Sequence, residues 1–195
     1  MNKVKKIIGV TGITGSGTST VAAILAEICH GIVISADKLA HEAMGKGQEA
    51  YDKIVQEFGK EILNENSDIN RRVLGSIVFA DSKKLKLLES IVHPAVIGKT
   101  KDIIAGSDKI CIVDAPLLIE SEMHKICDYV WLVTASDNVR LQRIMARDGI
   151  DEEVAKMRLK NRAKDDILRP YANVIITNNT DLTCLRAEIN ALIDC

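Results

Sequence analysis

The stretch that decides the fold is Lys5–Glu27, KKIIGVTGITGSGTSTVAAILAE. It starts with a β-branched apolar run at Ile7–Thr11, passes through a glycine-rich turn, and continues with apolar residues at helical spacing. A strand that turns directly into a helix directs backbone N–H groups toward one point, where they can bind an anion. Glycines at 12, 15 and 17 let an anion approach the backbone and permit positive φ. The stretch therefore predicts a phosphate-binding loop.

The loop has the spacing of the P-loop motif G-x-x-x-x-G-K-[ST], with one departure: Thr18 stands in the lysine position. The motif's lysine reaches the β- and γ-phosphates, and its loss costs roughly 2–4 kcal/mol of transition-state stabilisation unless another cation replaces it. Alternatively, Thr18 simply caps a helix in a non-catalytic domain. The residues expected to bind ATP are Gly12, Ile13, Thr14, Gly15, Ser16, Gly17, Thr18, Ser19 and Thr20.

The composition argues against several other classes of protein. The 195 residues include 26 Lys+Arg and 27 Asp+Glu, without the basic excess of proteins that bind nucleic acid or anionic membranes. The five cysteines lack the spacing of a disulfide framework or a zinc site. No apolar run is long enough for a membrane span or a signal peptide. We expect a cytoplasmic protein, a monomer or weak homo-oligomer, with no nucleic-acid or membrane partner.

Short β-branched runs alternate with helical stretches, which predicts an α/β fold of three layers around a parallel sheet. Because these runs lack polar alternation, we expect strands buried on both faces. The predicted strands are Ile7–Thr11, Ile32–Ser35, Ile110–Val113, Tyr129–Val133 and Val174–Thr177.

Residues 1–195 are expected to form one domain with two helical additions. Residues 36–106 are helical throughout and too long for a simple crossover, so we interpret them as a substrate-binding insertion. Residues 147–170 form a polar helical block before the last strand, and we interpret this block as a lid.

Two carboxylates follow predicted strands. Asp37 lies just past the second strand, where a carboxylate can orient or deprotonate an attacking hydroxyl. Its structural alternative is a helix N-terminal carboxylate with Ser35 as N-cap. Asp114 ends the third strand in the position of an acid that holds Mg²⁺, with Ser19 as the hydroxyl ligand. An ordinary turn aspartate before Pro116 is an equal alternative.

Basic residues at helical spacing follow the fourth strand. Arg140, Arg143 and Arg147 share one helix face, which is either a solvated basic surface or a site for anions. Separately, His93 and Pro94 interrupt a long helical stretch, and we interpret them as a hinge rather than as a catalytic base.

Together these features resemble the dephospho-CoA kinase family, which transfers the γ-phosphoryl group of ATP to the ribose 3′-hydroxyl of dephospho-CoA. The similarity runs from about Lys5 to Asn178 and rests on the order and spacing of several short pieces. These pieces are GITGSGTST, Ala36-Asp37 with Leu39-Ala40, INRRVLGSIVFAD, LESIVHP, DAPLLIE, RLQRIMARDG, Arg158 and ANVIITNN.

The resemblance implies a P-loop NTPase fold and in-line transfer from Mg-ATP. It implies that Asp37 assists the hydroxyl and that Arg143 and Arg147 face ATP phosphates. It also implies that the helical insertion, with the segment after Asp37, forms the dephospho-CoA site and that residues 147–170 are the lid. The residues expected to bind this substrate are His41, Arg71, His93, Pro116 and Leu117.

The sequence departs from the family's pattern at several charged or polar positions. The family carries lysine at Thr18 and Leu168, aspartate at Ser35, Asn173 and Thr177, arginine at His41, and glutamine at Arg162. Arg162, on the predicted lid, offers a planar guanidinium that could replace the loop lysine. Two alternatives to the kinase stay open: a non-catalytic relative that binds nucleotide or CoA, and a kinase for another nucleoside or nucleotide.

Overall fold

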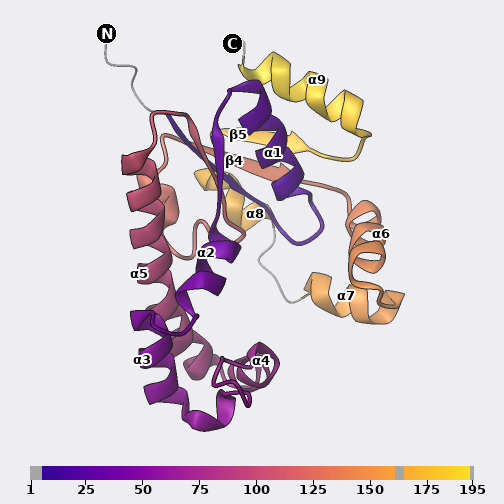
Figure 1. Ribbon diagram of the computed structural model, residues 1–195. Helices are drawn as coiled ribbons and strands as arrows, with labels where there is room; N and C mark the ends of the chain where they lie inside the picture. The colour runs from indigo at the N-terminus through magenta and orange to yellow at the C-terminus, as the bar shows by residue number, and fades with distance from the viewer. Residues whose placement is uncertain (1–5, 161–164, 194–195) are drawn as a thin grey trace. The chain divides into compact units, whose positions relative to one another are not determined.

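The computed structural model describes residues 6–160 and 165–193 (Figure 1). The chain divides into two compact units, Met1–Ile34 with Ser107–Cys195 and Ser35–Gly106. We call the first the sheet unit, because it contains the β-sheet, and the second the helical unit. The role of the helical unit in substrate binding stays a prediction.

The described strands form one sheet in the order β2-β3-β1-β4-β5. The strand β1 pairs in parallel with β3 and β4, and β4 pairs in parallel with β5. The predicted parallel α/β fold is therefore confirmed. The bounds are β1 (Ile7–Thr11), β2 (Ile32–Ser35), β3 (Cys111–Asp114), β4 (Tyr129–Thr134) and β5 (Val174–Thr177).

The third strand lies one residue later than predicted. Its last residue, Asp114, is opposite Val10 of β1 in the ladder, while Gly9 is opposite Val113. The strand therefore includes this polar residue as its last member, because the backbone of Asp114 has a partner in the central strand.

The central strand is buried on both faces. Ile8 and Val10 belong to a core cluster with residues of α1 (Thr18–Ile28) and α9 (Leu182–Ile193), two helices that contact each other beside the sheet (Figure 1). On the other face, a Cβ added to Gly9 would lie 2.7 Å from Leu118 Cδ2 and 2.9 Å from Cys127 Sγ. The central strand is thus buried on both faces, as predicted, and Gly9 is required for the close approach of Leu118 and Cys127.

Further helical elements of the sheet unit follow the strands. The helices α6 and α7 contact each other, and Leu168 of α8 packs with Ile13 and Leu132 in a small core cluster. The bounds are η2 (Met123–Ile126), α6 (Asp137–Asp148), α7 (Glu152–Lys160), α8 (Asp165–Leu168) and η3 (Arg169–Tyr171).

The helical unit is organised around its longest helix, α5 (Ser82–Gly106), which contacts α2, α3 and α4. Each of these shorter helices buries apolar residues at helical spacing, such as Leu39 and Ala43 in α2. The unit is not helical throughout, because Leu63 and Ile69 form an isolated antiparallel bridge. The remaining bounds are α2 (Ala36–Ala43), α3 (Glu49–Phe58), η1 (Lys60–Ile62) and α4 (Arg71–Ala80).

The predicted interruption at His93-Pro94 is wrong, since α5 continues through Pro94. Proline removes one N–H from a helix and bends it rather than always ending it. Pro94 and Ser90, the residue whose carbonyl loses this partner, are both exposed, so water can reach that carbonyl. The helix α5 contacts the shorter helices and is buried on both sides of the proline, at Val92 before it and at Val96 and Thr100 after it.

Among the helices of the described residues, none combines the length and the apolar character needed to span a bilayer.

Candidate active site

The glycine-rich loop connects the carboxyl end of β1 to the first turn of α1. Gly15 and Gly17 have φ of 85° and 92°, a region that residues with a Cβ rarely adopt. A Cβ on Gly12 would lie 2.3 Å from the carbonyl oxygen of Val133, and one on Gly17 would lie 2.4 Å from Asn178 Nδ2. The loop conformation therefore requires these glycines for two reasons, backbone conformation and close approach of neighbouring strands.

Ser19 and Asp114 lie together at the start of α1. The Ser19 hydroxyl donates a 2.7 Å hydrogen bond to Asp114 Oδ2, and Asp114 is only 7% exposed at the end of β3. Both residues were predicted from the sequence as ligands of the same Mg²⁺, and the structure brings them into contact. A hydroxyl and a carboxylate are oxygen donors of the kind that Mg²⁺ prefers, with phosphates and water completing its shell. The two residues therefore fit a Mg²⁺ ion whose other ligands come from the nucleotide and from water. Within the described ranges, no three or more His, Cys, Asp or Glu side chains gather into a metal site of their own.

The loop is bound from its carbonyl side by residues of α6 and of the segment after β5. Arg140 Nε donates to the Thr14 carbonyl at 3.1 Å, and Asn178 Nδ2 donates to the Ser16 carbonyl at 2.8 Å. Arg143 Nη1 lies 3.3 Å from the same Ser16 carbonyl. The three predicted arginines therefore do not form a solvated basic face, because two of them bind the loop backbone.

Asn178 was not among the predicted site residues. It is 3% exposed, and its backbone N–H continues the sheet by donating to Thr134 O at 2.8 Å. The polar pair Asn178-Asn179 directly after an apolar strand was the available signal, because polar side chains at the carboxyl ends of parallel strands gather at one edge.

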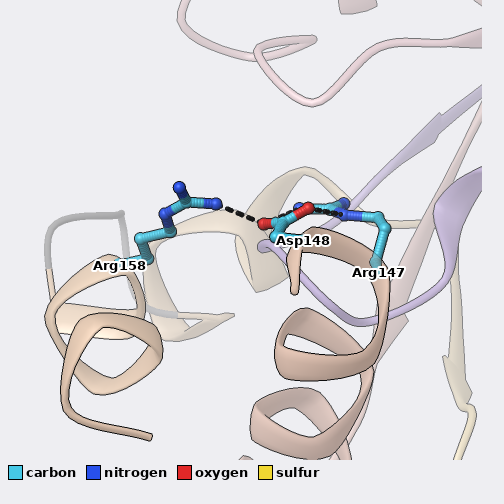
Figure 2. Close-up of polar contacts among 3 residues, drawn as sticks. All are labelled: Arg147, Asp148 and Arg158. Carbon is cyan, nitrogen blue, oxygen red and sulfur yellow. Dashed lines mark hydrogen bonds and ion pairs between the residues drawn. The ribbon is translucent and has the colours of Figure 1, made fainter. Parts of the chain in front are cut away.

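Arg147, the third arginine of the predicted face, pairs with a carboxylate instead of the loop (Figure 2). Its Nε donates to Asp148 Oδ1 at 2.7 Å, and its Nη2 donates to Asp148 Oδ2 at 3.1 Å. Arg158 of α7 donates to the same Oδ2, so Asp148 links α6 to α7. Chiefly through the hydrogen bond from Arg147, these contacts hold the pKa of Asp148 below its ordinary value. The link is therefore complete at neutral pH and is lost only as the pH falls through that lowered pKa.

Changing Asp148 to asparagine is expected to speed amide hydrogen exchange in α7 by about two- to fivefold at neutral pH. Asparagine has the same shape but no charge, so the link to Arg158 weakens. The measurement is site-resolved exchange by mass spectrometry. Glu153→Gln is the matched control, because Glu153 is exposed on α7 and its loss leaves Asp148 intact. Equal exchange in wild type and Asp148→Asn would contradict the link.

Several predicted residues lie in the helical unit. Asp37 is exposed in the first turn of α2, and Ser35 Oγ accepts from Lys38 N at 3.4 Å as the N-cap of this helix. Arg71 Nη1 lies 3.0 Å from Nδ1 of His41. Since a guanidinium only donates, Nδ1 of His41 is the acceptor and the ring proton is on Nε2. The structure thus brings two predicted substrate-binding residues together, while His93 lies half-buried on α5.

The remaining predicted residues are placed as follows. The Pro116 carbonyl accepts a 3.4 Å hydrogen bond from Thr11 Oγ1, and Leu117 is exposed beside it. Thr18 is half-buried as the first residue of α1, with Gly17 as N-cap. Arg162 lies outside the described residues. The structure therefore does not test the prediction that Arg162 replaces the loop lysine.

A family model described as dephospho-CoA kinase matches residues 6–183 of the chain. The chain belongs to the dephospho-CoA kinase family. Among its relatives, the dephospho-CoA kinase of Fusobacterium nucleatum subsp. nucleatum is 39% identical over 185 residues, which cover 94% of each chain. The dephospho-CoA kinase of Carboxydothermus hydrogenoformans is 37% identical over 189 residues, 94% of this chain and 90% of the relative. The resemblance deduced from the sequence is confirmed.

Solved structures support the same family and fold. TT1252 from Thermus thermophilus has a TM-score of 0.83 and 30% identity, with 98% of each chain covered. Dephospho-CoA kinase from Campylobacter jejuni has a TM-score of 0.67 and 30% identity, covering 98% of this chain and 96% of that one. Shikimate kinase from Acinetobacter baumannii, at 16% identity and a TM-score of 0.57, shares the fold alone. The predicted P-loop NTPase fold is confirmed.

Proposed function

We propose that this chain is an ATP-dependent dephospho-CoA kinase, which forms coenzyme A by phosphorylating the ribose 3′-hydroxyl. The observation that carries the proposal is the 2.7 Å contact of Ser19 with Asp114 beside a complete glycine loop, in a chain of this family. This pair is the oxygen donor set that a kinase needs for the Mg²⁺ of its nucleotide.

In the proposed reaction the loop N–H groups bind the phosphates of ATP, and Asp37 accepts the proton of the 3′-hydroxyl. The hydroxyl oxygen forms a bond to the γ-phosphorus in line with the bond that breaks, and ADP leaves with the breaking bond's electrons. Mg²⁺, when bound by Ser19 and Asp114, neutralises charge on the β- and γ-phosphates. Arg143 and Arg147 of α6 add positive charge for the transferred group.

We assign the dephospho-CoA site to the helical unit, with the contacting pair His41 and Arg71 as its polar part. His93, Pro116 and Leu117 complete the proposed substrate contacts. Residues 147–170 act as the lid in this proposal, and the enzyme works in the cytoplasm as a monomer or weak homo-oligomer. Guanidinium and imidazole donors suit the phosphate groups of dephospho-CoA.

Thr18 favours a second candidate, a protein that binds nucleotide or CoA without transferring phosphate. The backbone cradle does not depend on the lysine, whereas transfer draws on positive charge at the γ-phosphate. A kinase acting on another nucleoside or nucleotide is a further alternative, since Ser35 and His41 depart from the family's pattern near the proposed acceptor site.

The test is an assay of purified protein with Mg-ATP and dephospho-CoA, with coenzyme A identified by mass and Mg-ATP binding measured by calorimetry. ATP-dependent appearance of coenzyme A is the expected result. Tight Mg-ATP binding without product from dephospho-CoA would overturn the proposal. Assays with other nucleosides and nucleotides would then separate a kinase of different specificity from a binding protein.

A further inference from the structure

The loop that lacks its lysine carries positive charge on its carbonyl side. Arg143 Nη1 donates to Ser16 O at 3.3 Å and more weakly approaches Gly15 O at 3.5 Å. Asn178 binds the same guanidinium through two hydrogen bonds, a fork that fixes its orientation. Arg143 Nη1 donates to Asn178 O at 3.0 Å, and Nη2 donates to Asn178 Oδ1 at 3.2 Å. The position of this cation relative to the loop is therefore specified by several contacts.

The charge of Arg143 is not neutralised by the residues that bind it. All its hydrogen-bond acceptors in the described part of the chain are carbonyl or amide oxygens. Arg140 differs, because its Nη1 also donates to the carboxylate of Asp137 at 2.8 Å. The net positive charge behind the loop thus comes mainly from Arg143.

The peptide groups transmit this charge toward the opposite side of the loop. In a planar trans peptide, the C=O and the following N–H point in opposite directions. The carbonyl of Ser16 shares its peptide with the N–H of Gly17, and the carbonyl of Thr14 shares its peptide with the N–H of Gly15. A donor on each carbonyl polarises the peptide and makes its N–H a stronger donor, since connected hydrogen bonds reinforce one another. The contacts of Arg143, Arg140 and Asn178 therefore strengthen N–H groups that can bind phosphate.

We propose that Arg143, fixed by Asn178, is a positioning residue that replaces part of the missing lysine charge through the loop's own peptide groups. This inference rests on the proposed nucleotide site and specifies how Arg143 supplies its charge. The inference also explains how the loop can bind a nucleotide with Thr18 in the position of the lysine. A charge about 8 Å from an anion, at an effective dielectric constant of about 20, changes affinity by roughly ten- to thirtyfold.

The test measures Mg-ATP affinity by calorimetry at low ionic strength, with thermal melting as a check of folding. Arg143→Gln is expected to bind Mg-ATP ten- to thirtyfold more weakly. Arg143→Lys keeps the charge and loses the fork, so it should stay within about threefold of wild type. The matched control is Arg186→Gln, which removes a guanidinium paired with Glu27 in the last turn of α1, away from the loop; it should change affinity less than twofold.

A second variant keeps the proposal testable if Arg143→Gln does not fold. Asn178→Asp retains two oxygen acceptors for Arg143 but neutralises its charge and removes the donor to Ser16 O. It is expected to weaken Mg-ATP binding at least tenfold. Wild-type affinity in folded Asn178→Asp or Arg143→Gln would overturn the proposal. So would equal losses in Arg143→Lys and Arg143→Gln, which would indicate a purely structural fork.

The outcome is separable from that of the proposed function. Affinities that follow this pattern, in a protein that makes no coenzyme A, would support the charge replacement and reject only the kinase assignment. Failure of wild-type protein to bind Mg-ATP would overturn the charge replacement itself.

Discussion

Asp37→Asn is expected to lower kcat for coenzyme A formation by about 10²- to 10⁴-fold, the range for loss of a general base. Asparagine has the same size and can still orient a hydroxyl, but it does not accept the proton. Ser35, rather than Asp37, caps α2 through its side chain. The substitution should therefore leave the helix intact and cost at most about 1 kcal/mol of favourable helix-dipole interaction.

Two measurements separate this catalytic role from a structural one. Mg-ATP affinity of Asp37→Asn should stay within about twofold of wild type, because Asp37 acts on the acceptor. Glu42→Gln is the matched control, since Glu42 is also exposed on α2 and has no proposed role; its kcat should be unchanged. A normal kcat in Asp37→Asn would show that Asp37 only serves the N-terminus of α2.

The sheet could be predicted from the sequence because its signal is local. Each strand is a short β-branched run, and three predicted ranges, including Ile7–Thr11, coincide with the strands of the structure. The phosphate loop was predictable for the same reason, because the glycines and the following helix lie within one continuous stretch. The contact of Ser19 with Asp114 could be anticipated from topology, since residues at the carboxyl ends of adjacent parallel strands lie at one edge.

The environment of the arginines could not be predicted, because it depends on contacts between distant segments. Helical spacing places Arg140, Arg143 and Arg147 on one face of α6, but it does not say what that face meets. The partners of Arg143, the Ser16 carbonyl and Asn178, lie far along the chain. Arg147 instead pairs with its sequence neighbour Asp148, which also binds Arg158 of the next helix. The error at Pro94 has a similar origin, because the packing that keeps α5 continuous comes from other helices.

These contacts also separate Arg143 from Arg147, two residues for which the sequence predicted the same role. Arg143 binds backbone oxygens of the loop, whereas Arg147 is paired with a carboxylate that it shares with Arg158 (Figure 2). Arg147 would have to exchange Asp148 for a phosphate in order to act on ATP. Arg147 is exposed, whereas Asp148 is half-buried and also binds Arg158, so the carboxylate keeps a charged partner when Arg147 leaves it.

Asp114→Asn is expected to lower kcat/KM for Mg-ATP by about 10²- to 10³-fold, the effect of losing one charged contact in a catalytic site. The amide oxygen can still accept the hydrogen bond from Ser19 Oγ, so the loop should keep its conformation. What is lost is the negative charge that favours Mg²⁺ over water at this position. The Mg²⁺ concentration that gives half-maximal rate should therefore rise, and excess Mg²⁺ should restore part of the activity.

The matched control for this variant is Asp128→Asn. Asp128 precedes β4, and its Oδ2 accepts a 2.6 Å hydrogen bond from Ile7 N, a structural contact with no proposed part in the reaction. This control removes the same charge and should change kcat/KM by less than about threefold. If folded Asp114→Asn retained wild-type kcat/KM and the same Mg²⁺ dependence, Asp114 would have only a structural role at the end of β3. The contact with Ser19 would then only hold the start of α1 against β3, and the kinase proposal would lose the observation that carries it.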